Sequence, residues 1–248
     1  MEVKLVDSMG SDLSVVNAAR VSFDKITEWD YAVDPNDVNS LGVKTKTLKE
    51  ADKRIIKFLA RENHWTPFGH ASLSFHIKAP IFVARQLGKH QVGLVWNEIS
   101  RRYVDSPPEF YYPKNWRKRN EDKKQGSYED QFVKEISYTH PYIGDMQGNT
   151  VTITESVTKR ANTIATQAYN LYTEMLEAGI CPEQARMVLP QSMYTEWYWT
   201  GSLIAFARVC KLRLKKDTQK ETRDIAIQID EIVKKICPIS WESLVTGV

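Results

Sequence analysis

Residues 80–103 carry the side chains in this chain that are best suited to chemistry. They combine cations, amides and a small hydroxyl, Ser100, with an apolar run. Cations bind phosphate, and amides form hydrogen bonds with the edges of planar heterocycles. The segment therefore predicts a site for a phosphorylated ligand that carries a ring. Its cations and amides are Arg85, Lys89, His90, Arg101, Arg102, Gln86, Gln91 and Asn97.

The same segment resembles the signature of the flavin-dependent thymidylate synthases, whose usual form is R-Q-W-x-R-H-R-x-x-S-x-N-E-x-S-x-R-Y. Residues 3–24, 62–86 and 185–203 are similar to further blocks of that family and stand in the same order. The matching blocks together cover more than half of the chain. An ordered set of long motifs is far more specific than one motif, so we predict that the chain belongs to this family.

The resemblance implies a methyltransferase that converts dUMP to dTMP. FAD would be its cofactor, with methylenetetrahydrofolate and NADPH as co-substrates, and the cofactor would carry the difficult chemistry. A cysteine-dependent enzyme of the same activity places its nucleophile in a Pro-Cys-His context. Here the cysteines lie in GICPEQ, RVCKLR and KICPIS, so no cysteine has the expected setting.

Seven positions match residues that bind dUMP in the family. Arginine suits the phosphate because its planar fork donates two hydrogen bonds. A single arginine is more often a solvated surface group, but three in separate blocks favour a site. Catalysis is assigned by resemblance to Arg213, His64 and Ser100. The dUMP positions are Gln86, Glu98, Ser100, Arg101, Arg102, Arg186 and Arg213.

The expected flavin contacts depart from the family pattern in two places. Lys89-His90-Gln91 replaces Arg-His-Arg, and the segment from Arg85 to Asn97 is one residue longer than the pattern. Ile204 stands where a hydrogen-bonding residue is common, and Arg208 lies one turn further along the same helix face. We therefore predict that Arg208 supplies the positive charge that the family often has at the position of Ile204. The FAD positions are Ser22, Thr66, Lys89, His90, Gln91, Asn97, Ser202 and Arg208, with His64 as a further match.

Composition limits the other function classes. The 248 residues carry a formal charge of +3, which argues against a protein that coats nucleic acid. We find no signal or transit peptide and no apolar run of about 20 residues that predicts a membrane span. The three cysteines lack metal-ligand spacing, as do the histidines, so no metal is expected and a reducing cytoplasm is favoured.

Periodicity predicts the elements that position these residues. A capping-box pattern at Thr47 predicts a helix to about Arg61, and alternation over residues 71–79 predicts a half-buried strand. Pro80 is expected to open a helix to about Lys89, after a loop at residues 64–70. Residues 107–150 form the least regular stretch. Further helices are predicted near 164–176 with a stop at Gly179, at 182–190, at 191–213 and at 218–236.

The pattern indicates an α+β class in a single domain of residues 1–248, with an excursion at about 107–150. The resemblance implies a helical core with a small, mainly antiparallel sheet, and a homotetramer whose active sites are shared between subunits. Two alternatives stay open. One is a flavin enzyme that makes another C5-modified pyrimidine nucleotide, and the other is a non-catalytic relative that binds nucleotide or RNA. Four aromatic residues are interpreted as packing: Tyr194, Trp197, Tyr198 and Trp199.

Overall fold

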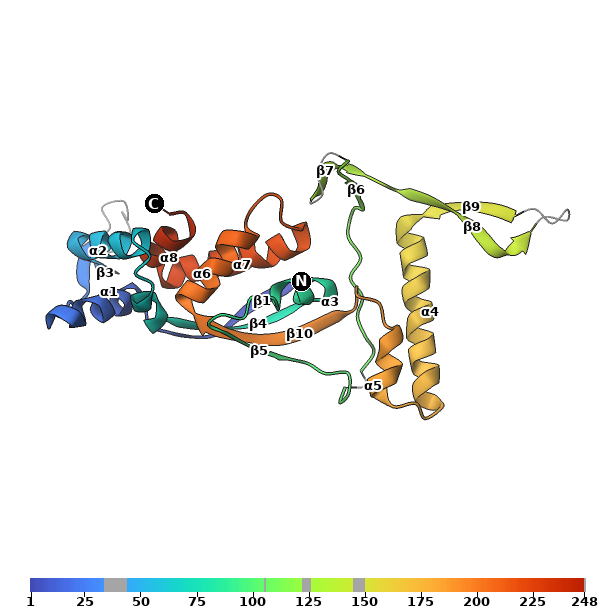
Figure 1. The fold of residues 1–248 in the computed structure, drawn as a ribbon, viewed down its shortest axis with the longest axis horizontal. Coiled ribbons are helices and arrows are strands. Elements are labelled where there is room, and N and C mark those ends of the chain that lie inside the picture. The colour runs from blue at the N-terminus through green and yellow to red at the C-terminus, as the bar shows by residue number, and fades with distance from the viewer. Residues whose placement is uncertain (34–43, 105, 122–125, 145–149, 248) are drawn as a thin grey trace. The chain divides into compact units, whose positions relative to one another are not determined.

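A four-stranded sheet organises the computed structural model, which describes residues 1–33, 44–104, 106–121, 126–144 and 150–247 (Figure 1). Its strand order is β1-β4-β10-β5, and β1 and β4 are antiparallel. Mixed helices and small antiparallel sheets confirm the predicted α+β class. The strands are β1 (Glu2–Met9), β4 (Ser72–Pro80), β10 (Tyr194–Ser202) and β5 (Leu94–Glu98).

The predicted half-buried strand is β4. Leu73, Phe75 and Ile77 are buried, while the residues between them are partly exposed. Strand side chains alternate between the two faces, so this pattern places one apolar face of β4 in the core. Pro80 ends this strand instead of opening a helix, because the helix α3 begins after it (Ile81–Leu87).

The chain divides into two compact units. The first unit comprises Met1–Lys78, Leu87–Asn97 and Trp197–Val248, and the second comprises Ala79–Gln86 and Glu98–Glu196. The single-domain prediction is not tested by this division and stays a prediction. The helices and 3-10 turns of the first unit are α1 (Asp12–Arg20), η1 (Val21–Phe23), α2 (Glu50–Arg61), η2 (Thr66–His70), α6 (Leu203–Arg213), α7 (Lys220–Ile236) and α8 (Pro238–Val245).

The C-terminal helix α8 is held in the first unit by two buried carboxylates. The backbone N–H groups of Ile239 and Ser240 donate to Asp12, at 3.0 and 2.8 Å. A carboxylate at a helix N-terminus satisfies N–H groups that have no partner within the helix. The Trp241 indole N–H donates to Asp230 at 2.8 Å. These bonds tie α8 to α1 and α7, and α8 also packs against α2 and α6.

The predicted start of the second helix is wrong. Thr47 is the last residue of β3 (Lys44–Thr47) and pairs with Asp30 in β2 (Asp30–Val33), so it does not cap a helix. The helix α2 begins three residues later, at Glu50, without a side-chain cap. The loop expected at 64–70 contains η2, whose first turn includes Pro67.

The helix predicted over residues 191–213 is also wrong in its first half. That half is β10, in which Thr195, Trp197 and Trp199 are buried in a period of two. The Trp96 ring stacks on Trp197 at a centroid distance of 4.4 Å. The packing interpretation is thus confirmed for the two buried tryptophans of β10, whereas Tyr198 is 52% exposed.

The second unit contains β-hairpins and a long helix. Strands lie within residues 107–150, where little regularity was expected. The predicted helix near 164–176 is confirmed as α4 (Val157–Glu177), followed by Gly179 with a φ of +82°. The predicted helix at 182–190 is present as α5 (Pro182–Ala185) and the 3-10 turn η3 (Arg186–Val188). The two antiparallel hairpins are β6 (Arg117–Arg119) with β7 (Ser127–Phe132), and β8 (Glu135–Gly144) with β9 (Thr150–Ser156).

None of the helices in the described ranges has the length and apolar character that crossing a membrane requires.

Candidate active site

The predicted FAD and dUMP positions separate between the two units. All eight FAD positions, together with His64 and Arg213, belong to the first unit. The other dUMP positions belong to the second unit. The second-unit set is Gln86, Glu98, Ser100, Arg101, Arg102 and Arg186.

A turn between α3 and β5 presents the Lys89-His90-Gln91 segment. The His90 N–H donates to the Leu87 carbonyl at 2.9 Å, and the Leu94 N–H donates to the Gln91 carbonyl at 3.2 Å. Gly93, with a φ of +75°, allows the chain to turn back into β5. The Lys89-His90-Gln91 departure therefore falls in a hydrogen-bonded turn, whereas Ile204, the other departure, lies on α6.

The turn packs closely on the end of β10. The Ser202 N–H donates to the Gly93 carbonyl at 3.3 Å. A Cβ atom at Gly201 would lie 2.3 Å from that carbonyl oxygen and 2.6 Å from the Leu94 side chain. Gly201 is thus the residue that lets the predicted flavin segment approach β10.

One hydrogen bond joins a predicted FAD residue with a predicted dUMP residue. The Arg213 Nε–H at the end of α6 donates to Nε2 of His90 at 3.0 Å. His90 must accept at Nε2, so its imidazole is neutral here, with its proton on Nδ1. Burial, and then the charge of Arg213, lower the pKa of His90, while burial lowers the pKa of Arg213.

The lowered pKa of His90 predicts a pH dependence of stability. The unfolded chain takes up this proton near pH 6.5, whereas the folded chain does so only at lower pH. Between those values the unfolded state binds more protons, so stability falls as pH falls below about 6.5. We expect the difference in unfolding free energy between wild type and His90→Gln to shrink from pH 7.5 to pH 5.5 in urea titrations. A difference independent of pH would contradict the assignment of this group.

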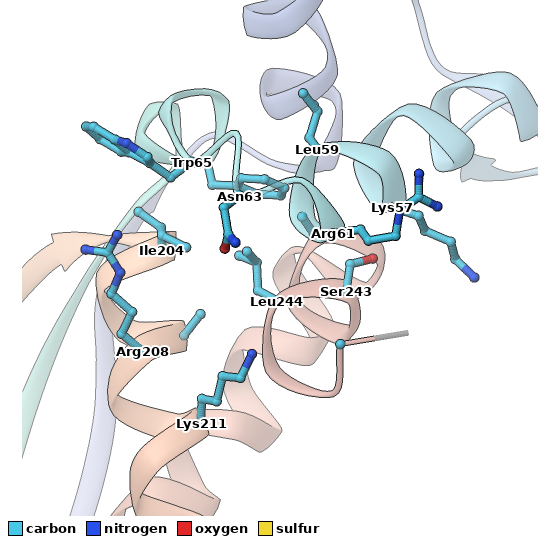
Figure 2. A pocket seen from close by; sticks show the side chains of 14 residues that line it. Lys57, Leu59, Arg61, Asn63, Trp65, Ile204, Arg208, Lys211, Ser243 and Leu244 are labelled. Carbon is cyan, nitrogen blue, oxygen red and sulfur yellow. The ribbon is translucent and has the colours of Figure 1, made fainter.

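A pocket of about 710 Å³ lies in the first unit between α2, η2, α6 and α8 (Figure 2). Its floor is apolar, and four of its lining side chains are cations. Asn63, Trp65 and Ser243 add an amide, an indole and a hydroxyl. None of the described lining residues is Asp or Glu. The cations are Lys57, Arg61, Arg208 and Lys211.

Arg208 and Ile204 line this same pocket, as the one-turn spacing predicts. Lys211 shares their face of α6, because residues three and four apart are neighbours on a helix. Arg213 is nine residues after Ile204, about two and a half turns, and therefore lies on the opposite face. Arg208 and Arg213 thus serve two different sides of α6.

The other predicted FAD positions lie at exposed turns and element ends. Ser22 lies in η1, Thr66 in η2 and Asn97 in β5, and all three are exposed. Ser202 caps α6, and its hydroxyl accepts from the Ala205 N–H at 3.4 Å. His64, also exposed, packs edge-on against Phe58 at 5.9 Å.

In the second unit, two arginines that are predicted to bind phosphate contact the same residue, Glu183. Arg102 forms an ion pair with Glu183 at 2.5 Å. Arg186 donates through Nε to the Glu183 carbonyl at 3.4 Å. Both arginines are exposed. A phosphate would therefore have to compete with the Glu183 carboxylate for Arg102.

The remaining dUMP positions border β5 and α3. The Thr195 hydroxyl donates to the Glu98 carboxylate at 2.6 Å and orients it. The Ser100 hydroxyl accepts from the Arg102 N–H at 3.3 Å. Arg101 donates to the Ser106 carbonyl. Gln86 lies partly buried on α3.

Sequence reasoning did not find Lys57, Trp65, Lys211 or Thr195. Lys211 follows Arg208 at a helical spacing, which is the one local signal for it. Lys57 and Trp65 come from α2 and the segment before η2, far from α6 in the sequence. Only the tertiary structure brings Lys57, Trp65 and Lys211 to one pocket.

Two of the cysteines are poor candidates for a nucleophile. Cys210 and Cys237 are buried, and burial raises the pKa of both thiols, that of Cys237 to about 12. A thiol with a raised pKa supplies little thiolate. Cys181 is exposed. Within the described ranges no group of three or more His, Cys, Asp or Glu side chains is arranged to hold a metal ion.

The fold is shared with a pyrimidine-nucleotide methylase. The chain is similar to crystal structures of the UMP/dUMP methylase PolB from Streptomyces cacaoi, bound with 5-Br dUMP and with 5-Br UMP. The TM-scores are 0.71 and 0.68, both at 27% identity. The similarity covers 99% of this chain and 94% or 93% of those chains.

Curated relatives agree along nearly the whole length. A flavin-dependent thymidylate synthase of Thermus thermophilus is 37% identical over 96% of this chain and 73% of its own length. That of Thermosipho africanus is 35% identical over 97% of this chain and 89% of its own length. The family model "Thymidylate synthase complementing protein" matches residues 4–239.

The chain belongs to the flavin-dependent thymidylate synthase family. Its activity is that of an FAD-dependent methyltransferase, which converts dUMP to dTMP with folate and NADPH as co-substrates. The resemblance in the sequence blocks is therefore confirmed. The alternative of a non-catalytic relative is not supported.

Proposed function

We propose that the two residue sets described above bind the two ligands of this reaction, FAD and dUMP. The second-unit residues would bind dUMP, with Arg102 and Arg186 on the phosphate. Arg213, which belongs to the first unit, would also contribute to nucleotide binding. The observation that carries this proposal is the hydrogen bond between Arg213 and His90, since it joins a residue assigned to dUMP with one assigned to FAD.

The chain's own groups have defined roles in this proposal. Arg213 would place its positive charge on the pyrimidine or phosphate once it exchanges His90 for the ligand. Thr195 would keep the Glu98 carboxylate oriented toward the nucleotide. Ser100 and His64 stay assigned to catalysis, Ser100 at the turn that follows β5 and His64 after α2. Bound FAD would supply the redox chemistry that no side chain provides.

Assembly and location belong to the same proposal. The separation of FAD and dUMP positions between two sets of segments is compatible with active sites shared between subunits of a homotetramer. Arg102 and Arg186 are exposed in the single chain, as residues of a site completed by a second subunit would be. We place the enzyme in the cytoplasm, where its folate, NADPH and dUMP are expected.

Product analysis tests the proposal. Purified protein is incubated with dUMP, methylenetetrahydrofolate, FAD and NADPH, and the nucleotide is identified by mass spectrometry. We expect dTMP, formed only when all four components are present. An unmodified nucleotide from flavin-loaded protein would overturn the proposal, and another C5 adduct would identify a different product.

UMP is a second candidate substrate. The specific support is the similarity to PolB, a UMP/dUMP methylase solved with 5-Br UMP. The same assay with UMP in place of dUMP distinguishes the two. We expect dUMP to be preferred, because the curated relatives at 33–37% identity are thymidylate synthases.

A further inference from the structure

Glu183 contacts both arginines that the proposed function places on the phosphate, although it belongs to none of the assigned residue sets. Its carboxylate forms an ion pair with Arg102 at 2.5 Å. Its backbone carbonyl accepts a hydrogen bond from Arg186 Nε at 3.4 Å. Carboxylate and phosphate oxygens are the same kind of partner for a guanidinium group, because both accept charge-assisted hydrogen bonds. Glu183 therefore presents to Arg102 an anion that belongs to the chain itself.

The short helix α5 fixes the backbone of Glu183. The N–H groups of Gln184 and Ala185 both donate to the Cys181 carbonyl at 3.0 Å, which closes the turn. Ala185 is fully buried, and α5 packs against α4 (Figure 1). Glu183 comes two residues before Ala185, about 200° around the helix, so its exposed side chain leaves the opposite side of α5. The carboxylate is thus directed away from the core of the second unit.

Arg102 is also held by groups other than Glu183. Its guanidinium carbon lies 5.4 Å from the centre of the Tyr103 ring, within the range of a cation–π contact. Its backbone N–H donates to the Ser100 hydroxyl at 3.3 Å, and the Tyr103 N–H donates to the Ser100 carbonyl at 3.0 Å. These contacts can keep Arg102 in place when the carboxylate leaves. The side chains of Arg102 and Glu183 are 47% and 54% exposed, so a ligand can reach the ion pair.

We propose that Glu183 is a competitor of the nucleotide phosphate: its carboxylate leaves Arg102 when dUMP binds and returns to Arg102 as dTMP leaves. The inference rests on the proposed function, which places Arg102 on the phosphate, and it adds Glu183 as a positioning residue. Exposed ion pairs are weak, so the competition lowers nucleotide affinity by a factor of about two to five without blocking the site. The product keeps the phosphate of the substrate, so Glu183 favours product release, which limits the turnover of many enzymes.

Calorimetric titration of flavin-loaded Glu183→Gln tests the inference. The amide keeps the shape of the side chain and the backbone carbonyl but removes the negative charge. We expect the dissociation constants of dUMP and dTMP to fall about two- to fivefold, whereas that of deoxyuridine, which has no phosphate, should not change. Glu177→Gln, an exposed acid at the end of α4, is the matched control. Weaker or unchanged dUMP binding, or an equal change for deoxyuridine, would overturn the inference.

A double-mutant cycle shows whether Glu183 acts through Arg102. In an Arg102→Gln background, Glu183→Gln should leave dUMP affinity unchanged, because the ion pair is already absent. Tightening of the same size in both backgrounds would mean that Glu183 acts through its general charge, which would contradict the inference. Stopped-flow measurement adds the rate: dTMP should dissociate from Glu183→Gln about two- to fivefold more slowly than from wild type. An unchanged dissociation rate would contradict the role in product release.

These measurements also separate the inference from the proposed function, because they need neither folate nor NADPH. If Arg102→Gln weakened dUMP binding while Glu183→Gln did not tighten it, only the inference would fail. If wild type made no dTMP while dUMP binding still showed the coupling between Glu183 and Arg102, the proposed reaction would fail and the inference would stand.

Discussion

The Arg213→Ala enzyme is expected to bind dUMP about tenfold or more weakly than wild type. Hydrogen bonds to charged groups contribute about 1.5–3 kcal/mol, and each 1.4 kcal/mol corresponds to a factor of ten. Arg213 is partly buried at the end of α6, with a lowered pKa caused by burial. A partly buried charge is screened less by solvent, so its loss should be felt fully.

Isothermal titration with dUMP measures this effect on flavin-loaded protein. Arg213→Lys keeps the charge but loses the planar fork, so we expect an intermediate affinity. Arg54→Ala, an exposed arginine on α2 outside the pocket, serves as control. Unchanged dUMP affinity in a folded Arg213→Ala variant would remove Arg213 from the nucleotide site.

Gly201→Ala is expected to give the largest loss of stability among the substitutions considered. The added Cβ would lie 2.3 Å from the Gly93 carbonyl oxygen and 2.6 Å from the Leu94 side chain. Because one neighbour is backbone, β10 and the turn after α3 must move apart. Overpacking of this kind typically costs about 1–3 kcal/mol. We expect a drop in Tm of roughly 2–12 °C, and weaker FAD binding because Lys89-His90-Gln91 moves with the turn.

Gly69→Ala is the matched control for this substitution. A Cβ at Gly69 meets no atom within 4 Å, and its backbone is not in the left-handed region. Thermal denaturation of the two variants isolates the effect of the contact from that of the added methyl group. Equal Tm values would show that the two segments separate without cost.

The sequence by itself determined the elements in which apolar residues recur at a regular local spacing. The alternation in β4 and the helical spacing in α4 and α7 identified those elements, because burial of one face imposes a period of two or 3.6. The ordered motifs identified the family for a similar reason, since they are contiguous in the chain.

Tertiary structure decided where local patterns were ambiguous. Trp197 and Trp199 fit a strand, yet with Tyr194 and Tyr198 they also fit a helix. The place of β10 between β4 and β5 in the sheet decides for the strand. Thr47 has the type of a helix cap, but its ladder partner is Asp30.

The candidate site shows the same division. The sequence alone assigned His90 to flavin and Arg213 to nucleotide, each from its own motif. That these two residues, 123 positions apart, share a hydrogen bond follows from the packing of α6 against the turn after α3. The cationic pocket likewise requires α2, α6 and α8 together. Such convergence depends on long-range contacts, which no local period encodes, and so only the folded chain reveals it.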